Sequence, residues 1–463
     1  MKDCKYRLGE GDVMGETVEP STGISGFPRE PIDDIVDPLK RFMHIEASSG
    51  IVLIVVTLTA LVLANSPLSE QFLAFWKAPV GFRIGSFQMF HSLQHWINDG
   101  LMAVFFFVIG LEVKRELVMG ELQDLRQAAL PIAAALGGMV VPACIYFSLL
   151  HGAPGERGWG IPMATDIAFV VGCLAVLGSR IPGSLRIMLL SLAIADDIGA
   201  IVVIAIGYTE SLNLTALILG VVGIGIVIGL MEVGVRNLAV YLLFMVLVWF
   251  AFHESGIHAT IAGVTFGLLT PTQAWISEGR LGMIANNTCN FLLGEGWSGS
   301  PDRYDMLRHM EVAAKKSISP LERFEAELHP WVGFLIMPLF ALANAGVKLQ
   351  LSDFTNPVAT AVLLGLLIGK PAGITIFSWL AVSLGFARLP KGVSWGVIAG
   401  SGFLAGIGFT MAIFIASLAV EGNLLDAAKV GIIVGSFLSA IIGLAALVLL
   451  LPKSSAHPGP RHS

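Results

Sequence analysis

The sequence predicts an all-α polytopic membrane protein with about twelve transmembrane helices. Of its 463 residues, 55% are hydrophobic and only 13% are charged, whereas a soluble domain carries about 25% charged residues. A helix that crosses a bilayer needs about 20 mostly apolar residues, and the chain contains twelve candidate stretches. They lie at about 49–65, 96–112, 127–150, 158–178, 185–208, 213–231, 237–252, 256–270, 330–347, 357–386, 393–420 and 428–451.

The basic residues predict the orientation of these spans. Twelve is an even number, so both termini lie on the same side of the membrane. Of the 28 Lys and Arg residues, 22 fall on the side of the termini, and Lys370 lies within a span. Basic residues concentrate on the cytoplasmic side, so both termini are predicted to be cytoplasmic. The other side receives five basic residues, namely Lys77, Arg83, Arg157, Lys348 and Lys429.

Polar segments flank and interrupt the transmembrane domain, which is predicted at 47–452. Residues 1–46 are polar and acidic and lack the early apolar core of a signal peptide, so they are predicted to form a disordered cytoplasmic tail. Residues 453–463 form a second cytoplasmic tail. Within the domain, 271–329 is predicted to be a long cytoplasmic loop, and the sequence gives no role to 1–46 or to 271–318.

Two local structures are predicted outside the spans. In the first external loop, VGFRIGSFQMF at 80–90 alternates apolar and polar residues around Gly85, a pattern that favours a β-hairpin. The free edge of a hairpin can pair with a second copy, so a homodimer through the hairpin around Arg83–Phe87 is predicted. At the end of the long loop, Ser319 and Pro320 suit the cap and first turn of a helix.

Two adjacent aspartates, Asp196 and Asp197, are the strongest functional signal. They are the tenth and eleventh residues of the apolar run 187–206, and one Asp at a helix centre costs about 3 kcal/mol on membrane insertion. Such residues usually serve transport or proton relay. Neighbours on a helix point about 100° apart, so Asp196 can pair with Lys370 while Asp197 faces a water-filled cavity.

The fourth and eleventh spans are predicted to be broken helices. Thr165 and Asp166 follow a Gly- and Pro-containing run, and SGFLAGIGFTM in the eleventh span is rich in glycine. Paired interruptions of this kind typify transporter sites. Spans 3–5 and 10–12 then form two inverted three-helix repeats, because seven spans separate their starts. Asp166 can balance positive half-helix N-termini and Lys370 a negative C-terminus.

Other polar residues in the spans receive structural interpretations. Asp99 begins the second span and is predicted to cap it, and His258 is predicted to be a helix-end histidine. An empty aspartate site would hold protons, which a small cation that prefers oxygen could displace. Two protons released for one monovalent cation would move net charge.

Three other classes of membrane protein were weighed against an antiporter. A sodium-coupled symporter of similar architecture would take up an organic substrate. An intramembrane aspartyl protease needs two aspartates on separate helices, and the GxGD match, Gly9 to Asp12, lies in the polar tail. A channel would favour rings of charge over one asymmetric cluster. The contiguous pair therefore favours an antiporter, which is a transporter and not an enzyme.

Several motifs together resemble the NhaA-type sodium/proton antiporter family. They are LMAVFFFVIGLEVKREL, IPMATDIAF, LAIADDIGAI, GIHATIAGV, LHPWV, LANAGV, LLIGKPAGI and GIGFTMAIFIASLA, in unchanged order across roughly 47–451. The resemblance implies electrogenic, pH-regulated exchange of cytoplasmic Na⁺ or Li⁺ for external H⁺ in a bacterial inner membrane. NhaA is itself a known inverted-repeat transporter, so the repeats are implied as well. No cofactor and no nucleic-acid partner are expected.

The resemblance also implies roles for individual residues. Asp197 would be the main Na⁺ ligand, and Asp196 would pair with Lys370 and share the proton chemistry. Thr165 and Asp166 would lie where the broken helices cross. The family's pH-responsive cluster corresponds to Glu112, Arg115, Glu116, Glu325 and His329. The sequence departs from the family nearby, with Glu322 and Ala326 in place of a basic residue and a histidine, a longer preceding loop and an extra acidic tail.

Overall fold

The structure is a computed structural model that describes residues 46–84, 87–208, 212–235, 238–292, 302–390 and 392–451. The described residues form two compact units, one within 270–326 and one within 46–269 and 327–451. The predicted tail at 453–463, and all but the last residue of the tail at 1–46, lie outside the described residues.

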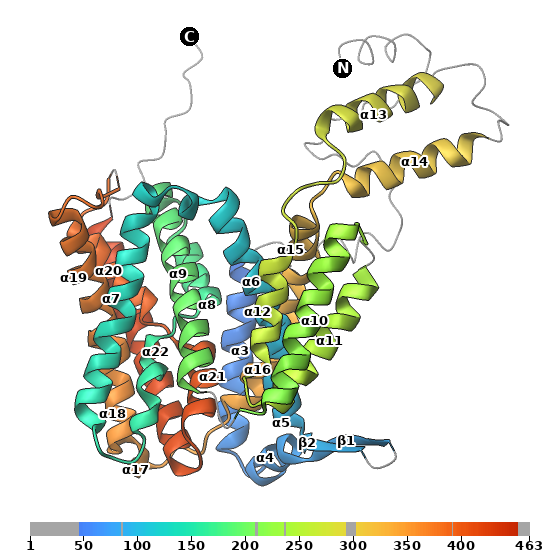
Figure 1. Ribbon diagram of the computed structural model, residues 1–463. Coiled ribbons are helices and arrows are strands. Elements are labelled where there is room, and N and C mark those ends of the chain that lie inside the picture. The colour runs from blue at the N-terminus through green and yellow to red at the C-terminus, as the bar shows by residue number, and fades with distance from the viewer. Residues whose placement is uncertain are drawn as a thin grey trace, which may run out of the picture. The chain divides into compact units, whose positions relative to one another are not determined.

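The larger unit is built from helices in the order of the predicted apolar stretches (Figure 1). Its first half comprises α3 (Glu46–Ala64), α4 (Ser69–Lys77), α5 (Leu93–Trp96), η1 (Ile97–Leu101), α6 (Met102–Met119), η2 (Glu121–Gln123), α7 (Leu125–Leu150), η3 (Glu156–Met163), α8 (Ile167–Leu177), η4 (Gly178–Arg180), α9 (Gly183–Gly207), α10 (Leu214–Val233), α11 (Leu238–Ser255) and α12 (Thr260–Leu269). Its second half comprises η5 (Val332–Ile336), α16 (Met337–Asn344), α17 (Leu351–Phe354), α18 (Pro357–Leu364), η6 (Gly365–Gly369), α19 (Lys370–Ser383), α20 (Trp395–Ala405), α21 (Phe409–Ala419) and α22 (Asn423–Leu450).

The described part contains eight helical segments that are long and apolar enough to cross a membrane. The number rises to ten if each of two bent pairs, α3 with α4 and α20 with α21, counts as one span. Two further apolar helices, Val240–Ser255 and Thr260–Leu269, are shorter. At about 1.5 Å of rise per residue they fall short of a core about 30 Å thick. The structure therefore supports eight to ten spans, and the predicted twelve spans with their inverted repeats stay a prediction.

The outer faces of several helices are apolar, as a lipid environment requires. On α10, Ile218, Leu219 and Val222 are each more than half exposed. Exposed apolar patches of this extent are rare on soluble monomers, whereas lipid tails are as apolar as these side chains. The same pattern explains why the composition is so rich in hydrophobic residues.

Glycines allow the closest helix contact in the larger unit, which is between α7 and α19. A Cβ atom added to Gly373 would overlap the carbonyl oxygen of Gly137, and a Cβ added to Gly137 would overlap that of Gly373. The two backbones therefore approach closely only because neither residue has a side chain. Small residues at helix crossings serve this purpose in membranes, and the contact holds α19 in place beside the centre of the unit.

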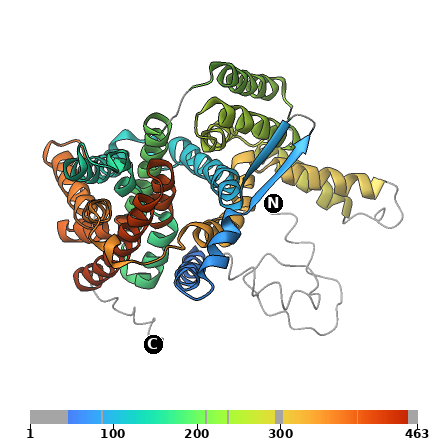
Figure 2. The same ribbon diagram turned by 90° about the horizontal axis from the view of Figure 1, so that it is seen from below.

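The predicted β-hairpin is confirmed. Strand β1 (Pro79–Ile84) pairs antiparallel with β2 (Phe87–Ser92), with Pro79 opposite Ser92 and Ile84 opposite Phe87. Figures 1 and 2 show the hairpin extending from α5 toward the α11 side of the unit. The hairpin, α4 and α17 lie at the same end of the unit in Figure 1. The predicted topology requires this, because it puts the segments around 66–95 and 348–356 on one side.

The segment at 271–329, predicted as a long cytoplasmic loop between spans, contains helices. Much of this segment is helical, with α13 (Glu278–Leu292), α14 (Asp302–Lys316) and the start of α15 (Pro320–Trp331). Helices α13 and α14 are too polar to match the apolar pattern by which the spans were predicted. The predicted helix start is confirmed: Ser319 Oγ accepts a hydrogen bond from the backbone N–H of Glu322 at 3.2 Å. The Glu322 carboxylate in turn accepts from the backbone N–H of Ser319, which completes a capping box.

Candidate functional site

Helix α9 buries both aspartates of the central pair. Asp196 is 1% exposed and Asp197 is 3% exposed, although the outer face of the same helix is open. The local sequence LAIADDIGAI is helical because small and apolar residues surround the pair, and Pro182 ends the preceding turn. Two buried carboxyls on one apolar helix need compensation from elsewhere in the chain.

Lys370 provides that compensation to Asp196. Its ammonium Nζ lies 2.5 Å from Asp196 Oδ2 and also donates to the backbone oxygen of Met163. Thr165 Oγ1 donates to the same Asp196 oxygen. Both side chains of the ion pair are completely buried. The structure thus brings together Thr165, Asp196 and Lys370, which come from three separate spans.

A π-helical turn positions Lys370. Segment η6 has i→i+5 hydrogen bonding and ends at Gly369, immediately before the lysine. Pro371 follows, and a proline ring inside an α-helix clashes with the carbonyl four residues earlier, here that of Leu367. The wider turn relieves this clash. Lys370 therefore begins α19 beside the end of η3, whose last residue is Met163.

The two interrupted spans meet at Asp166. Residues 164–166 are extended between η3 and α8, and residues 406–408 separate α20 from α21, where the axis bends by 52°. The backbone N–H of Asp166 donates to Ile407 O at 2.7 Å. The Asp166 carboxylate accepts from the backbone N–H of Phe169 at 3.3 Å and from that of Thr410 at 3.0 Å. One side chain thereby stabilises the N-termini of α8 and α21.

Asp197 has a different environment from Asp196. Among the residues that the structure describes, no hydrogen bond reaches its carboxyl. Asp197 is only 3% exposed in this structure, and the water-filled cavity that the sequence predicted beside it stays a prediction. The environments of Asp196 and Asp197 differ because the two side chains point in different directions from the helix. Asp196 is held by Lys370 and Thr165, whereas the Asp197 carboxyl makes no hydrogen bond to the part of the chain that the structure describes.

Sequence reasoning missed Thr410 and misassigned Asp99. Thr410 donates through both its backbone N–H and its hydroxyl to Asp166. Its position directly after the glycine break, at the start of a half-helix, was the available signal. Asp99 does not cap the second span, because it lies inside η1 and Ser92 caps α5. Its carboxylate instead lies near histidines. His258 does occupy a helix end, with Nδ1 2.7 Å from Thr260 Oγ1 at the start of α12.

Comparisons with known proteins give the family of this arrangement. The family model described as Na⁺/H⁺ antiporter 1 matches residues 40–447. The chain belongs to the Na⁺/H⁺ antiporter 1 family. The Na⁺/H⁺ antiporter NhaA of Rhodopirellula baltica is 54% identical over 427 residues, which cover 92% of this chain and 97% of that protein.

Other relatives match over similar lengths. The Na⁺/H⁺ antiporter NhaA of Rhizobium meliloti is 51% identical over 427 residues, covering 92% of this chain and 98% of that protein. The Na⁺/H⁺ antiporter NhaA 3 of Acidiphilium cryptum is 49% identical over 446 residues, covering 96% and 97%. Members of this family are named as antiporters, so the chain is a multi-pass membrane transporter and not an enzyme.

The residues predicted to respond to pH lie on two helices of this antiporter. Glu112, Arg115 and Glu116 lie on α6, while Glu325 and His329 lie on α15. Glu116 Oε1 accepts a hydrogen bond from Ser191 Oγ at 3.0 Å. Ser191 lies on α9, five residues before Asp196, so this contact joins α6 to the helix that carries the aspartates.

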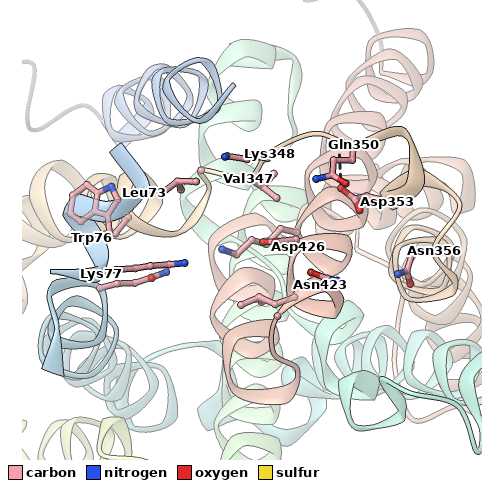
Figure 3. A pocket seen from close by; sticks show the side chains of 16 residues that line it. Leu73, Trp76, Lys77, Val347, Lys348, Gln350, Asp353, Asn356, Asn423 and Asp426 are labelled. Atoms are coloured by element: carbon pink, nitrogen blue, oxygen red, sulfur yellow. Dashed lines mark hydrogen bonds between the residues drawn. The ribbon is translucent and has the colours of Figure 1, made fainter. Parts of the chain in front are cut away.

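A pocket of about 640 Å³ lies apart from the buried aspartates (Figure 3). The side chains of Lys77, Lys348 and Asp426 reach it from α4, from the segment after α16 and from α22. Asp353 and Lys429 also line it. Three lysines against two aspartates make the pocket a poor site for a cation, so it does not compete with the aspartate pair as the Na⁺ site.

Proposed function

We propose that this chain exchanges cytoplasmic Na⁺ or Li⁺ for external H⁺ by alternating access at a mid-membrane site formed by Asp196 and Asp197. Membership of the Na⁺/H⁺ antiporter 1 family supports Na⁺ and H⁺ as the exchanged ions. The site, the use of Li⁺, the movement of net charge and the regulation by pH are the further parts of the proposal. The exchange needs no cofactor and no nucleic acid.

The charge balance of the buried residues carries the proposal. Two carboxyls, Asp196 and Asp197, are buried beside one ammonium, that of Lys370. Asp166 is also buried, but two helix N-termini stabilise its charge. An isolated ionised carboxylate is very costly in an apolar environment. The excess negative charge at Asp197 therefore has to be balanced by a proton or by a bound cation, and these are the two ions that an antiporter exchanges.

The same balance supports competition between Na⁺ and H⁺. Small hard cations prefer oxygen ligands, which carboxylates supply. A site that needs positive charge accepts either ion, and it does not accept both at once. Because Asp197 is enclosed in this structure, the ion has to enter through another conformation. The hydrogen-bonded crossing at Asp166 and Ile407 is where the broken helices would move.

We also propose that exchange moves net charge. In the proton-loaded state the ion pair between Asp196 and Lys370 would be open and each aspartate would carry a proton. Both protons would leave when one Na⁺ binds and the pair re-forms, so two protons would be exchanged for one Na⁺. A membrane potential contributes about 2.3 kcal/mol per net charge per 100 mV, which would drive the exchange. If only Asp197 released a proton, the exchange would be electroneutral.

The pH regulation is proposed to act through α6 and α15, with Glu112, Arg115, Glu116, Glu325 and His329 as the responding residues. The hydrogen bond from Ser191 to Glu116 supports a route from α6 to the aspartates on α9. Activity of Glu116→Gln as a function of pH tests this route. A profile identical to that of the wild type would contradict it.

The proposed setting is a bacterial inner membrane with both termini in the cytoplasm. The lipid bilayer is then the surroundings of the exposed apolar faces. A homodimer is proposed through the hairpin around Arg83–Phe87, because a two-stranded sheet leaves each strand with one unpaired edge. Val80 and Phe90 on this sheet are about half exposed.

Purified protein in liposomes with an acidic interior tests the central claim. External Na⁺ is added while an internal dye reports pH. The wild type is expected to raise the internal pH on addition of Na⁺ or Li⁺. Asp197→Asn is expected to match protein-free liposomes, because the remaining carboxyl is already paired with Lys370. Glu156→Gln, which changes an acid on a surface turn, is the matched control and should behave as the wild type.

Three outcomes would contradict parts of the proposal. Equal Na⁺ responses of the wild type and Asp197→Asn would remove Asp197 from the site. A rate that does not change when the membrane potential is set with K⁺ and valinomycin would remove the movement of net charge. Na⁺-driven uptake of an organic substrate without proton movement would identify a symporter.

A further inference from the structure

Three histidines gather at the hairpin end of the larger unit, far along the chain from the aspartates. His91 lies at the end of β2, His95 lies on α5 and His253 lies on α11. One ligating nitrogen from each ring lies within 4.8 Å of the other two. The rings of His91 and His95 stack, with centroids 4.2 Å apart. Each of these side chains is partly buried.

Asp99 adds a carboxylate to this histidine cluster. Its Oδ2 lies 3.5 Å from His95 Nε2 and 3.5 Å from His253 Nδ1. Four ligands held about 2.0–2.1 Å from a tetrahedral metal ion are about 3.4 Å apart from one another. Both distances from Asp99 therefore fit two edges of such a tetrahedron. The ring nitrogens lie within 4.8 Å of one another, a limit wider than an edge, and Asp99 lies outside that mutual distance. Closing a tetrahedron therefore requires the side chains of His91 and Asp99 to move toward each other.

We propose that His91, His95, His253 and Asp99 form a binding site for a divalent transition metal, with Zn²⁺ as the best-fitting ion. Imidazole nitrogens suit Zn²⁺, Cu²⁺ and Ni²⁺, whereas hard ions such as Na⁺ prefer oxygen. Three imidazoles and one carboxylate are a donor set of the zinc type. The site is thus chemically distinct from the aspartate pair on α9.

The state of the rings supports metal binding. His95 Nε2 is buried and makes no hydrogen bond within the described part of the chain. A bound metal ion would give this nitrogen the partner that it lacks in the described part of the chain.

The surroundings hold the ligands in position. Trp249 Nε1 donates to the backbone oxygen of Asp99 at 3.1 Å, and the Trp249 ring stacks on His253 with centroids 5.7 Å apart. The ring of Trp96 also stacks on the ring of Trp249, with centroids 6.5 Å apart. A bound ion would join the hairpin and α5 to α11, and nine helical elements separate α5 from α11 along the chain. Metal binding should therefore raise the unfolding temperature.

The binding experiment uses the full chain, purified in detergent with an affinity tag that lacks histidine and stripped of metal with a chelator. Zn²⁺ affinity is measured by competition with a chromophoric chelator, and Co²⁺ serves as a spectroscopic probe. One metal ion per chain is expected, with the intense visible bands of tetrahedral Co²⁺. Loss of a supporting carboxylate weakens metal affinity about 10- to 100-fold. Each of Asp99→Asn, His91→Ala, His95→Ala and His253→Ala removes a proposed ligand itself, so each should weaken affinity by more than about 100-fold.

Matched controls separate the site from adventitious binding. His151→Ala and His309→Ala remove histidines elsewhere in the chain and should leave Zn²⁺ affinity unchanged. Metal-free variants should retain Na⁺/H⁺ exchange in liposomes, which shows that they fold. Equal affinities of the wild type and the three histidine variants, or an equal loss in His151→Ala, would overturn the proposal. Neither result would affect the exchange at Asp197, so the two proposals fail independently.

Discussion

Asp166 accepts hydrogen bonds from both the backbone N–H and the hydroxyl of Thr410, although the two residues are 244 positions apart. The same carboxylate also accepts from Phe169 N–H in the first turn of α8. The Asp166 side chain therefore caps the N-terminus of α8 and also places its carboxylate at the N-terminus of α21. The carboxylate joins the two interrupted spans together with the backbone hydrogen bond from Asp166 N–H to Ile407 O.

Removal of the Thr410 hydroxyl should destabilise the crossing. A hydrogen bond to a charged group contributes about 1.5–3 kcal/mol, so Thr410→Val should lower the free energy of unfolding by about that amount. Thr410→Ser keeps the hydroxyl and should retain most of the stability. Unfolding by a denaturing detergent, followed by circular dichroism, measures both variants. If valine and serine gave the same stability, the hydroxyl would have no part in holding α21 to Asp166.

Removal of the Lys370 ammonium should leave Asp196 buried without its partner. Breaking a buried ion pair from one side costs about 3–5 kcal/mol, so Lys370→Met should lower the free energy of unfolding by roughly that amount. The second change Asp196→Asn removes the unpaired charge, and the double variant should recover most of the loss. Lys348→Met, at the rim of the pocket, is the matched control and should change stability little. Additive losses in the double variant would show that the pair is not coupled.

Added side chains at the crossing of α7 and α19 should separate these helices. Gly137→Ala and Gly373→Ala each bring a methyl group onto the opposite backbone oxygen. Overpacking costs about 1–3 kcal/mol, and the displacement of α19 should also move Lys370 and slow exchange. Gly225→Ala faces open space and should be neutral or stabilising by up to about 1 kcal/mol. Thermal unfolding and transport rates compare the three, and equal behaviour would exclude close packing as the role of these glycines.

Local patterns made much of this molecule predictable. The hairpin follows from alternation around Gly85, and the start of α15 follows from Ser319 and Pro320. Asp196 and Lys370 stood out because charge is rare in apolar runs, and the structure brings them into contact. In each case the signal lay within a few residues of the feature.

Features that depend on tertiary packing were not predictable in the same way. Asp99 looks like a helix cap in the sequence. In the structure its carboxylate lies near His95, one turn earlier, and near His253 of α11. The structure supports eight to ten of the twelve predicted spans, because apolar composition does not reveal that α12 has only ten residues. Helices α13 and α14 are too polar to be predicted as spans, so the prediction included them in the loop.

Because η6 is a π-helical turn, the direction in which the Lys370 side chain points depends on the number of residues in 365–369 as well as on their identity. Each hydrogen-bonded ring in a π-helix contains one residue more than a ring in an α-helix. Deletion of a single residue from 365–369 would restore an ordinary helix and turn the ammonium by about 100° away from Asp196. Substitutions here can accumulate gradually during evolution. A change of length cannot, because it would turn the ammonium away from its carboxylate partner in a single step.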